Sequence, residues 1–491
     1  MSGSRPIPTK NEAPKAAWSD LLGDGRGLYA LLVVLGTLLH SLQTLVMAII
    51  MPTVVADIGG AEYYTWAAML YTIGSIVGAA AIAPVWNLLG GARHGYAASG
   101  ICFLLGTLGC ALAPDMATLN VLRAVQGLAG GLVSGGSMAL VGGLFASNMR
   151  TRILAIQQAT FTLSHLLGPL VGGLFASLGW WRGSFWALVP FTALFTVLAW
   201  FRIPDRLGNE ALPGGTNRLP LLRLGMLALG VFLVAAAGLA KEAGVRGVLI
   251  AGAVALLWFT FRLDRASKNK LYPSSTLSAD SPVGLSLWIL FLTGSVQTTV
   301  TLFLPLLLQV VHGISPIFIS FVTIVISSGW TAGTFLVSGW AGSRERLVLR
   351  VGPLLMLAGL AGITISAQMQ TLAVLALEAF VYGVGLGFHH VHLVSRAMAA
   401  AAKGEERITA SAMPSIRSLG MAFGAALGGM LSTIAGLGTA TEPHAVGTAV
   451  TFVYRFNLIP LVIAALLMVR LVHIGNEMAG RQRGEVGKKE G

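Results

Sequence analysis

Long, unbroken runs of apolar residues dominate the chain from residue 28 onward. Each run is about as long as the roughly 18 to 20 residues that an α-helix needs to cross ~30 Å of hydrocarbon. The runs are continuous rather than alternating, which argues against a porin-like barrel, and a helix pairs its backbone groups within itself. We therefore expect an all-α integral membrane protein with about fourteen spans, at residues 28–52, 64–88, 96–113, 118–145, 153–178, 183–203, 219–240, 245–262, 283–311, 315–341, 347–368, 371–396, 407–435 and 449–473.

Basic residues recur in alternate connections between these runs. One set of connections holds most of them, namely Arg93, Arg150, Arg152, Arg202, Arg206, Arg218, Arg265, Lys268, Lys270, Arg344, Arg346, Arg350, Lys403 and Arg407. The other set carries mainly acidic residues, with Arg182, Lys241, Arg246 and Arg455 as exceptions. Cytoplasmic loops are enriched in Lys and Arg. The pattern predicts an even number of spans in the cytoplasmic (inner) membrane of the cell, with both termini cytoplasmic.

Polar connections divide the predicted spans into six, two and six. We expect an N-terminal cytoplasmic tail at 1–27, a six-helix bundle at 28–203, a linker with two extra spans at 204–282, a second six-helix bundle at 283–474 and a cytoplasmic C-terminal tail at 475–491. This layout suggests two related halves, although the two halves show little direct sequence similarity.

Composition supports a membrane protein and excludes a nucleic-acid-binding one. Hydrophobic residues make up 55% of the 491 residues and charged residues only 10%, whereas a soluble domain carries about 25% charged residues. The net charge of +13 comes from basic residues at the ends of the predicted helices. The expected partners are therefore the lipid bilayer, a small-molecule substrate and protons, and we expect a monomer without nucleic acid.

Glycines recur every four residues in several predicted helices. Gly127, Gly131 and Gly135 form one such row, and Gly420, Gly424 and Gly428 form another. Small residues at this spacing let two helix backbones approach closely in a bilayer. We expect these rows to be packing surfaces, and the candidate residues for packing or conformational change are Gly127, Gly168, Pro169, Gly172 and Gly173.

The predicted fourth span contains Arg123, Gln126 and Gly127 in the pattern Arg-x-x-Gln-Gly, and the predicted fifth span contains the run Gly168–Gly173. With these motifs the chain resembles the major facilitator superfamily, in particular its 14-helix drug:proton antiporter branch. The Arg-x-x-Gln-Gly pattern is similar to the signature of the fourth helix of that superfamily. The run Gly168–Gly173 resembles the antiporter signature of the fifth helix, and it continues through Trp181, Arg182, Phe185 and Pro190. Further similar positions are Pro305, Gln309, Gly313, Ser315, Pro316, Arg417 and Gly420, so the resemblance covers nearly all of residues 28–474.

This resemblance implies two six-helix bundles around a central cavity, plus two extra helices, working by alternating access. It implies export of a small, amphipathic organic compound by proton antiport. Two departures favour an alternative, an uncoupled facilitator or importer of a small solute on the same fold. Gln43 stands where the branch has an acidic residue in its first helix, and the loop Trp86–Gly95 offers only Arg93 and His94 as charged or titratable groups.

Ionisable residues inside a span usually have a task, because a charge at the bilayer centre costs ~2.5–3.5 kcal/mol on insertion scales. Glu378, Tyr382, His389, His392 and Arg396 lie within about 40° of one line on a helix, whereas His390 lies off that line. Such a stripe is suited to a proton path. The candidates for proton coupling are Glu378, His389, His392 and Arg123, and the open alternative is that Glu378 forms a structural pair with an arginine.

The resemblance also places polar residues of other helices at the central cavity. The candidates for substrate contact are His40, Gln43, His165, Tyr382 and Arg417. Arg123 and Arg417 leave this cavity less acidic than in relatives selective for cationic drugs, which favours neutral or anionic cargo.

Other function classes lack their sequence signatures. An intramembrane enzyme is not expected, because the chain has no His-Glu-x-x-His, Gly-x-Ser-x-Gly or phosphate-binding loop. No cofactor and no metal are expected, since the histidines at 389, 390 and 392 lie on one helix that cannot supply a tetrahedral set. A membrane sensor or scaffold that has lost transport would be marked by an extra soluble domain, for which we find no room after the last span.

Overall fold

The computed structural model describes residues 26–60, 66–204, 219–240, 242–314, 316–369, 372–437 and 442–487, with the backbone alone for 316–323 and 476–487. Most of the predicted N-terminal tail, the connection 205–218 and the side chain of Pro169 lie outside the described residues. The described chain is helical throughout: α1 (Arg26–Ile58), α2 (Trp66–Leu88), α3 (Ala92–Leu112), α4 (Met116–Leu144), α5 (Ser147–Ser177), α6 (Arg182–Trp186), α7 (Val189–Arg202), α8 (Leu221–Leu239), α9 (Ala243–Arg265), α10 (Pro282–Val310), α11 (Pro316–Val337), α12 (Ser343–Ser366), α13 (Leu372–Ala399), α14 (Glu406–Ile434) and α15 (Pro443–Gly487).

Twelve of the described helical stretches are long and apolar enough to cross a membrane. The other two predicted spans are α11, which is counted only as a shorter apolar helix over Ile324–Val337, and α14. α14 contains Glu406, Arg407 and Arg417 and packs against α10, α4, α2 and α8. Since neighbouring helices surround it, α14 does not need an apolar surface. The count of fourteen spans stays a prediction.

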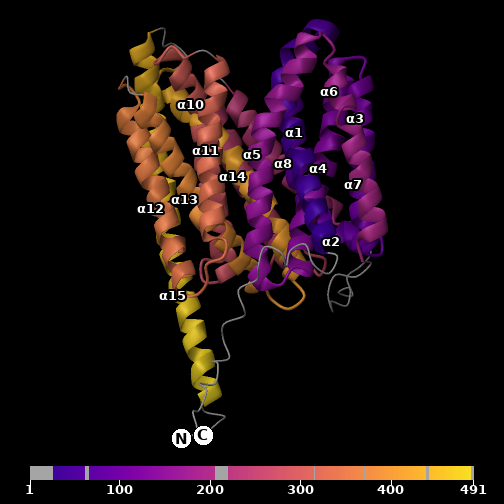
Figure 1. Cartoon of the computed structure of the whole chain (residues 1–491), viewed down its shortest axis with the longest axis vertical. Helices are drawn as coiled ribbons and strands as arrows, with labels where there is room; N and C mark the ends of the chain where they lie inside the picture. The colour runs from indigo at the N-terminus through magenta and orange to yellow at the C-terminus, as the bar shows by residue number, and fades with distance from the viewer. Residues whose placement is uncertain are drawn as a thin grey trace, which may run out of the picture.

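The helices gather into two groups that run roughly side by side (Figure 1). We call α1–α7 the N-terminal group and α10–α15 the C-terminal group. α8 packs against α9 and also contacts α2 and α14, so the two intervening helices touch both groups. The described residues of the predicted basic connections lie at one end of the helices, the lower end in Figure 1, which we call the basic end.

The same small-residue packing occurs in both groups. On α4, a Cβ on Gly127 or Gly131 would lie 2.2 or 2.0 Å from a carbonyl oxygen of α2. On α13, a Cβ on Gly383 or Gly387 would lie 2.1 or 2.3 Å from a carbonyl oxygen of α11. Only glycine permits this approach, which brings each pair of backbones into direct contact. The pairs α2–α4 and α11–α13 are therefore built alike.

Several helix boundaries differ from the sequence prediction, and three of these differences change the architecture. The predicted span 183–203 is divided into α6 and α7, because the helix restarts with Pro190 in its first turn, where proline fits without a backbone donor. α1 continues to Ile58. α15 continues to Gly487, well past the predicted end at 473, so much of the segment expected as a C-terminal tail is helical (Figure 1).

Arg246 is one of the basic residues in the mainly acidic connections, and its contacts explain its place there. Its guanidinium donates to the carbonyl of Ala240 at 2.5 Å, to the carbonyl of Gly429 at 3.2 Å and to the hydroxyl of Thr433 at 3.1 Å. It therefore satisfies carbonyls near the ends of α8 and α14, as basic side chains do at helix C-termini.

Candidate functional site

A buried polar cluster lies within the N-terminal group. The guanidinium of Arg123, on α4, is fully buried and lies over the ring of Tyr71, on α2, at 4.2 Å from the ring centre. It donates to Oε1 of Gln126 at 2.6 Å, and Gln126 donates to the hydroxyl of Thr107 at 2.9 Å. The Tyr71 hydroxyl lies 2.9 Å from Nδ1 of His40, on α1. Four helices thus contribute to one connected network.

Glycines of α4 make room for this network. A Cβ on Gly130 would lie 2.8 Å from the Tyr71 hydroxyl and 3.0 Å from Nδ1 of His40. Any side chain at position 130 would push the phenol and the imidazole away from α4. The four-residue spacing from Gln126 to Gly130 places the amide and this opening on one face of the helix.

The C-terminal group carries a cluster of the same composition. The guanidinium of Arg417, on α14, lies over the Trp330 ring of α11 at 5.0 Å and donates to Oε1 of Gln297, on α10, at 2.5 Å. The imidazole of His390, on α13, meets the same indole edge to face at 5.4 Å. Each group therefore holds an arginine over an aromatic ring, a glutamine on the guanidinium and a histidine against the ring.

Neither cluster contains a carboxylate partner for its arginine. Among the described residues, the ion pairs of the structure join other side chains, and none includes Arg123 or Arg417. A buried charge without a counter-ion is costly, and it is attracted to acceptor groups and anions. The two guanidinium groups therefore give the interior of the protein a positive potential.

Two further sequence candidates lie close to these clusters. Gln43 is fully buried, and both polar atoms of its amide lack a hydrogen-bond partner. It shares a face of α1 with Gly36 and His40, the face that meets α4. His165, on α5, lies between the face that packs on α1 at Gly168 and the face that contacts α11 at Thr162, and its Nδ1 lies 2.8 Å from the Phe161 carbonyl.

The predicted stripe on α13 lies against α12 over most of its length. Glu378 accepts a hydrogen bond from Ser366 of α12 at 2.7 Å, and its other oxygen is buried without a partner. Tyr382 and His389 pack on Gly359 and Gly352 of α12.

At the basic end of the stripe the side chains are tied to neighbouring helices. Nε2 of His392 lies 2.9 Å from the Val337 carbonyl of α11. Arg396 pairs with Glu345 of α12 at 3.0 Å. Glu378 is thus paired with a serine hydroxyl, and neither Arg123 nor Arg417 is its partner.

The packing candidates on α5 differ from one another. A Cβ on Gly168 would lie 2.6 Å from the Leu45 side chain of α1, and one on Gly172 would lie 3.2 Å from Ile49. Gly173 has open space on its side of α5, with nothing within 4 Å. Gly168 and Gly172 therefore form the α1 contact, whereas Gly173 faces away from it.

Hydrogen bonds between the two groups occur from the middle of the helices to the basic end. Near the middle, the Thr162 hydroxyl of α5 lies 2.6 Å from that of Thr331 on α11. At the basic end, Thr151 donates to the Ser338 carbonyl, and Arg407 donates to Asn87 at 3.1 Å. The two groups are thus held together at this end.

The segment between α9 and α10 strengthens this contact. The Tyr272 hydroxyl is bonded to Ser415 of α14 at 2.7 Å, and Ser415 donates to the Ile76 carbonyl of α2 at 3.0 Å. Lys270 lies 2.7 Å from Glu405, just before α14. A linker residue, a C-terminal helix and an N-terminal helix therefore share one chain of hydrogen bonds.

Sequence reasoning does not identify five members of the two clusters. Four of them sit in apolar runs without a distinguishing motif, namely Tyr71, Thr107, Gln297 and Trp330. The fifth, His390, lies off the α13 stripe. The only available signal was the unusual presence of polar or amphipathic side chains within spans. Among the described residues, no group of three or more His, Cys, Asp or Glu side chains is placed to hold a metal ion.

Comparison with known sequences gives a family. The chain matches the sequence model of the Major Facilitator Superfamily over residues 33–425. It is 30% identical over 439 residues to a protein of Mycobacterium tuberculosis named as a probable multidrug-efflux transporter, a match that covers 86% of this chain and 91% of that protein. It is 23% identical over 316 residues to multidrug resistance protein 3 of Bacillus subtilis, covering 62% of this chain and 59% of that protein.

Solved structures share the fold. The human organic anion transporter MFSD10 gives a TM-score of 0.63 at 16% identity, covering 89% of this chain and 99% of that chain. The proton:xylose symporter XylE gives a TM-score of 0.62 at 15% identity, covering 91% and 95%. Both likenesses concern the fold alone. With the family model matching most of its length and twelve candidate spans, this chain is a multi-pass membrane protein of the major facilitator superfamily, a secondary transporter and not an enzyme.

Proposed function

We propose that the chain exports small, amphipathic organic compounds in exchange for protons, by alternating access, as a member of the 14-helix drug:proton antiporter branch. The observation that carries this proposal is the pair of clusters, one in each group, in which an arginine lies over an aromatic ring beside a histidine. The names of the relatives from M. tuberculosis and B. subtilis support efflux.

The closed basic end supports alternating access. In the proposed orientation the basic end faces the cytoplasm, because Lys and Arg are retained on that side. Contacts such as Thr151 with Ser338 and Arg407 with Asn87 then block the cytoplasmic side. Rocking of the two groups about the contact between Thr162 and Thr331 would break these contacts and open the cytoplasmic side.

The charge of the clusters favours neutral or anionic cargo. Arg123 and Arg417 have glutamine and aromatic partners but no carboxylate among the described residues. A cationic drug would meet like charge in such a site, whereas an acceptor group on the cargo would satisfy a guanidinium. Tyr71 and Trp330 are the aromatic members of the two clusters, and both are buried in this structure.

His40 is the proposed proton carrier of the N-terminal cluster. Its Nδ1 is bonded to the Tyr71 hydroxyl, which leaves Nε2 for a ligand. A cargo that donates a hydrogen bond to Nε2 requires a neutral imidazole, so cargo and proton compete for one atom. Competition at one site is what exchange requires.

Glu378 is the second proposed carrier, with His389 and His392 on the same helix. Its unpaired oxygen is buried, as is Nε2 of His389. Protonation of the carboxyl would remove a buried negative charge. The Ser366 hydrogen bond would remain in either state.

The experiment uses purified protein in liposomes, with matched neutral, anionic and cationic amphipathic fluorophores. An imposed pH gradient is expected to drive accumulation of the neutral or anionic probe, and no accumulation of any probe would overturn the proposal. Two variants, His40→Gln and Glu378→Gln, identify the carrier. The variant that removes the proton carrier is expected to lose uphill transport but still to exchange probe for probe. His444→Gln is the control, because that side chain is exposed at the opposite end.

An uncoupled facilitator is the second candidate function. Gln43 occupies the first-helix position where an acid would be expected, and Glu378 lies against α12 rather than at the contact between the groups. Collapsing the pH gradient with an ionophore separates the two functions. Downhill flux would persist without change in a facilitator, and net accumulation would be absent from the start.

A further inference from the structure

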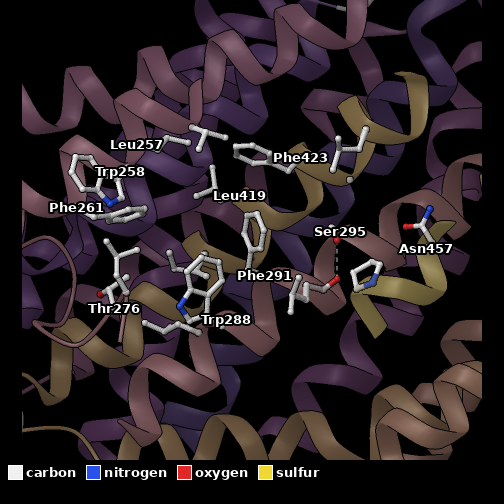
Figure 2. A pocket seen from close by; sticks show the side chains of 18 of the residues that line it. Leu257, Trp258, Phe261, Thr276, Trp288, Phe291, Ser295, Leu419, Phe423 and Asn457 are labelled. Atoms are coloured by element: carbon white, nitrogen blue, oxygen red, sulfur yellow. Dashed lines mark hydrogen bonds between the residues drawn. The ribbon is translucent and has the colours of Figure 1, made fainter. Parts of the chain in front are cut away.

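A hollow lies between α9, α10, α14 and α15. Its volume is about 590 Å³. Figure 2 shows Trp258 and Phe261 of α9 on one side, Trp288 and Phe291 of α10 below, and Leu419 and Phe423 of α14 above, with Asn457 of α15 at the far end. Aromatic and aliphatic side chains thus form almost the whole wall.

The few polar side chains in the wall are already satisfied. Thr276 donates to the Pro273 carbonyl at 2.6 Å, Ser295 to the Leu292 carbonyl at 2.8 Å and Asn457 to the Val453 carbonyl at 2.8 Å. The two hydroxyls thus donate their protons within the chain, and Asn457, at the far end, is the one amide among the lining residues. The hollow therefore suits a hydrocarbon chain and not a polar or charged cargo.

The hollow opens toward the membrane and runs toward the basic end. Trp258 of α9 and Phe456 of α15 are 52% and 46% exposed, so both edges of the opening face the surroundings of the helices. The wall extends from Thr276 and Leu277, in the segment that joins α9 to α10 at the basic end, to Pro460 within α15. Hydrocarbon from the adjoining leaflet can therefore enter from the side.

Positive charge lies at the basic end of this hollow. The Arg262 guanidinium lies over the Trp258 ring at 4.9 Å, and Arg265 follows in the last turn of α9; both side chains are exposed. The nearby acids are neutralised, because Asp264 pairs with Arg223 and Asp280 pairs with Arg470. Tryptophan and arginine together are typical of the headgroup level of a bilayer.

We propose that this hollow is a binding site for an acidic phospholipid of the basic-side leaflet. One acyl chain fills the space between α9 and α14, against Trp288, Phe291 and Phe423. The headgroup phosphate lies beside Arg262 and Arg265. The lipid thereby bridges a linker helix to the C-terminal group, where direct packing of α9 on α10 and α15 is sparse. This site is separate from the proposed cargo site and does not depend on it.

The test is native mass spectrometry of the purified chain after reconstitution with equal amounts of acidic and zwitterionic phospholipids of the same acyl composition. The wild type is expected to retain one acidic phospholipid in preference. Leu427→Trp, which fills the hollow from α14, is expected to abolish retention, and Arg262→Gln to reduce the acidic preference about five-fold, the weight of one basic residue at an anionic surface. The controls are Leu354→Trp, on an exposed face of α12, and Arg202→Gln, at the basic end of α7.

Each alternative occupant gives a different result. Equal retention of both lipids, or retention unchanged by Leu427→Trp, would overturn the proposal, as would a bound small molecule in place of lipid. If Leu427→Trp does not fold, brominated acyl chains provide a second measurement. Trp288→Phe in the wild-type background should remove part of the bromine quenching of tryptophan fluorescence, and quenching that is unchanged would contradict an acyl chain in the hollow.

Discussion

Arg123 lies over Tyr71, with its guanidinium carbon 4.2 Å from the centre of the ring. The Tyr71 hydroxyl lies 2.9 Å from Nδ1 of His40, so one tyrosine contacts a positive charge with the face of its ring and an imidazole with its hydroxyl. The two contacts can be separated by substitution, because only the first requires an aromatic ring and only the second requires the hydroxyl.

Tyr71→Phe and Tyr71→Leu should therefore differ. Phenylalanine keeps the ring under Arg123, so we expect thermal stability near that of the wild type but an altered pH dependence of transport, because His40 loses its partner. Leucine also removes the cation–π contact, which is worth about 2 kcal/mol when desolvated, so the unfolding temperature should fall as well. Equal unfolding temperatures for the two variants would contradict a stabilising role for the ring.

Gly131→Ala should prevent normal packing of α4 on α2. A Cβ at this position would lie 2.0 Å from the Ser75 carbonyl oxygen, a backbone atom that cannot move without the helix. We expect a loss of about 1–3 kcal/mol or failure to fold, measured as monodisperse protein after detergent extraction. Gly173→Ala is the matched control, because nothing lies within 4 Å of its added methyl group. Similar yields for both would show that the close approach is not needed.

Ser415→Ala should loosen the basic end. The change removes the hydrogen bonds to Tyr272 and to the Ile76 carbonyl. Their loss should destabilise the contact between the two groups by roughly 1–2 kcal/mol. A cysteine placed at Gly142, which faces Ala410 of α14, should then react with maleimide roughly tenfold faster, in a background without Cys102 and Cys110.

The control for this labelling is Ser432→Ala. It removes a serine hydroxyl from the same helix, near the opposite end, where the hydroxyl donates to Gly429. Its labelling rate should match that of the parent. If Ser415→Ala labels no faster than this control, the hydrogen-bond chain does not hold the two groups together.

Acid should weaken the opposite end through Asp57. Hydrogen bonds from Arg182 and Trp181 hold the pKa of this carboxyl below its usual range, outweighing a smaller effect of burial. Because the folded pKa is lowered, the stabilisation is complete above the ordinary pKa of about 3.9 and is lost as the pH falls through the lowered value. Asp57→Asn should show less loss of thermal stability between neutral pH and pH ~3 than the wild type. An identical acid profile would exclude this contribution.

Most helices could be predicted because each depends on a continuous run of residues along the sequence. The length of an apolar run determines whether it can span a bilayer. Rows of glycines such as Gly127 and Gly131 indicate a close contact with another helix. The sequence does not say which helix provides that contact. The sequence also does not predict the break between α6 and α7, because hydrophobicity changes little around Ala187. The extension of α15 is not predicted either, because a helix can continue beyond an apolar run.

The site was harder to predict, because a polar stripe on a helix does not show which neighbouring helix that stripe will contact. Glu378, Tyr382 and His389 do share a face, yet that face meets α12, while His390 on another face meets Trp330. The rotation of α13 is set by contacts such as Gly383 on Ile326 and Gly387 on Trp330, across more than fifty residues of sequence. Only the assembled bundle contains that information.

Because α15 is so long, movement at its far end reports on the C-terminal group. The helix is continuous from its first turn at Pro443 to Gly487, and its final turns stand clear of every other helix (Figure 1). A stiff rod magnifies a small tilt of its base into a larger sweep of its tip. A spin label or dye near position 487 would therefore register the swing of the C-terminal group during a turnover, without any label inside the cargo path.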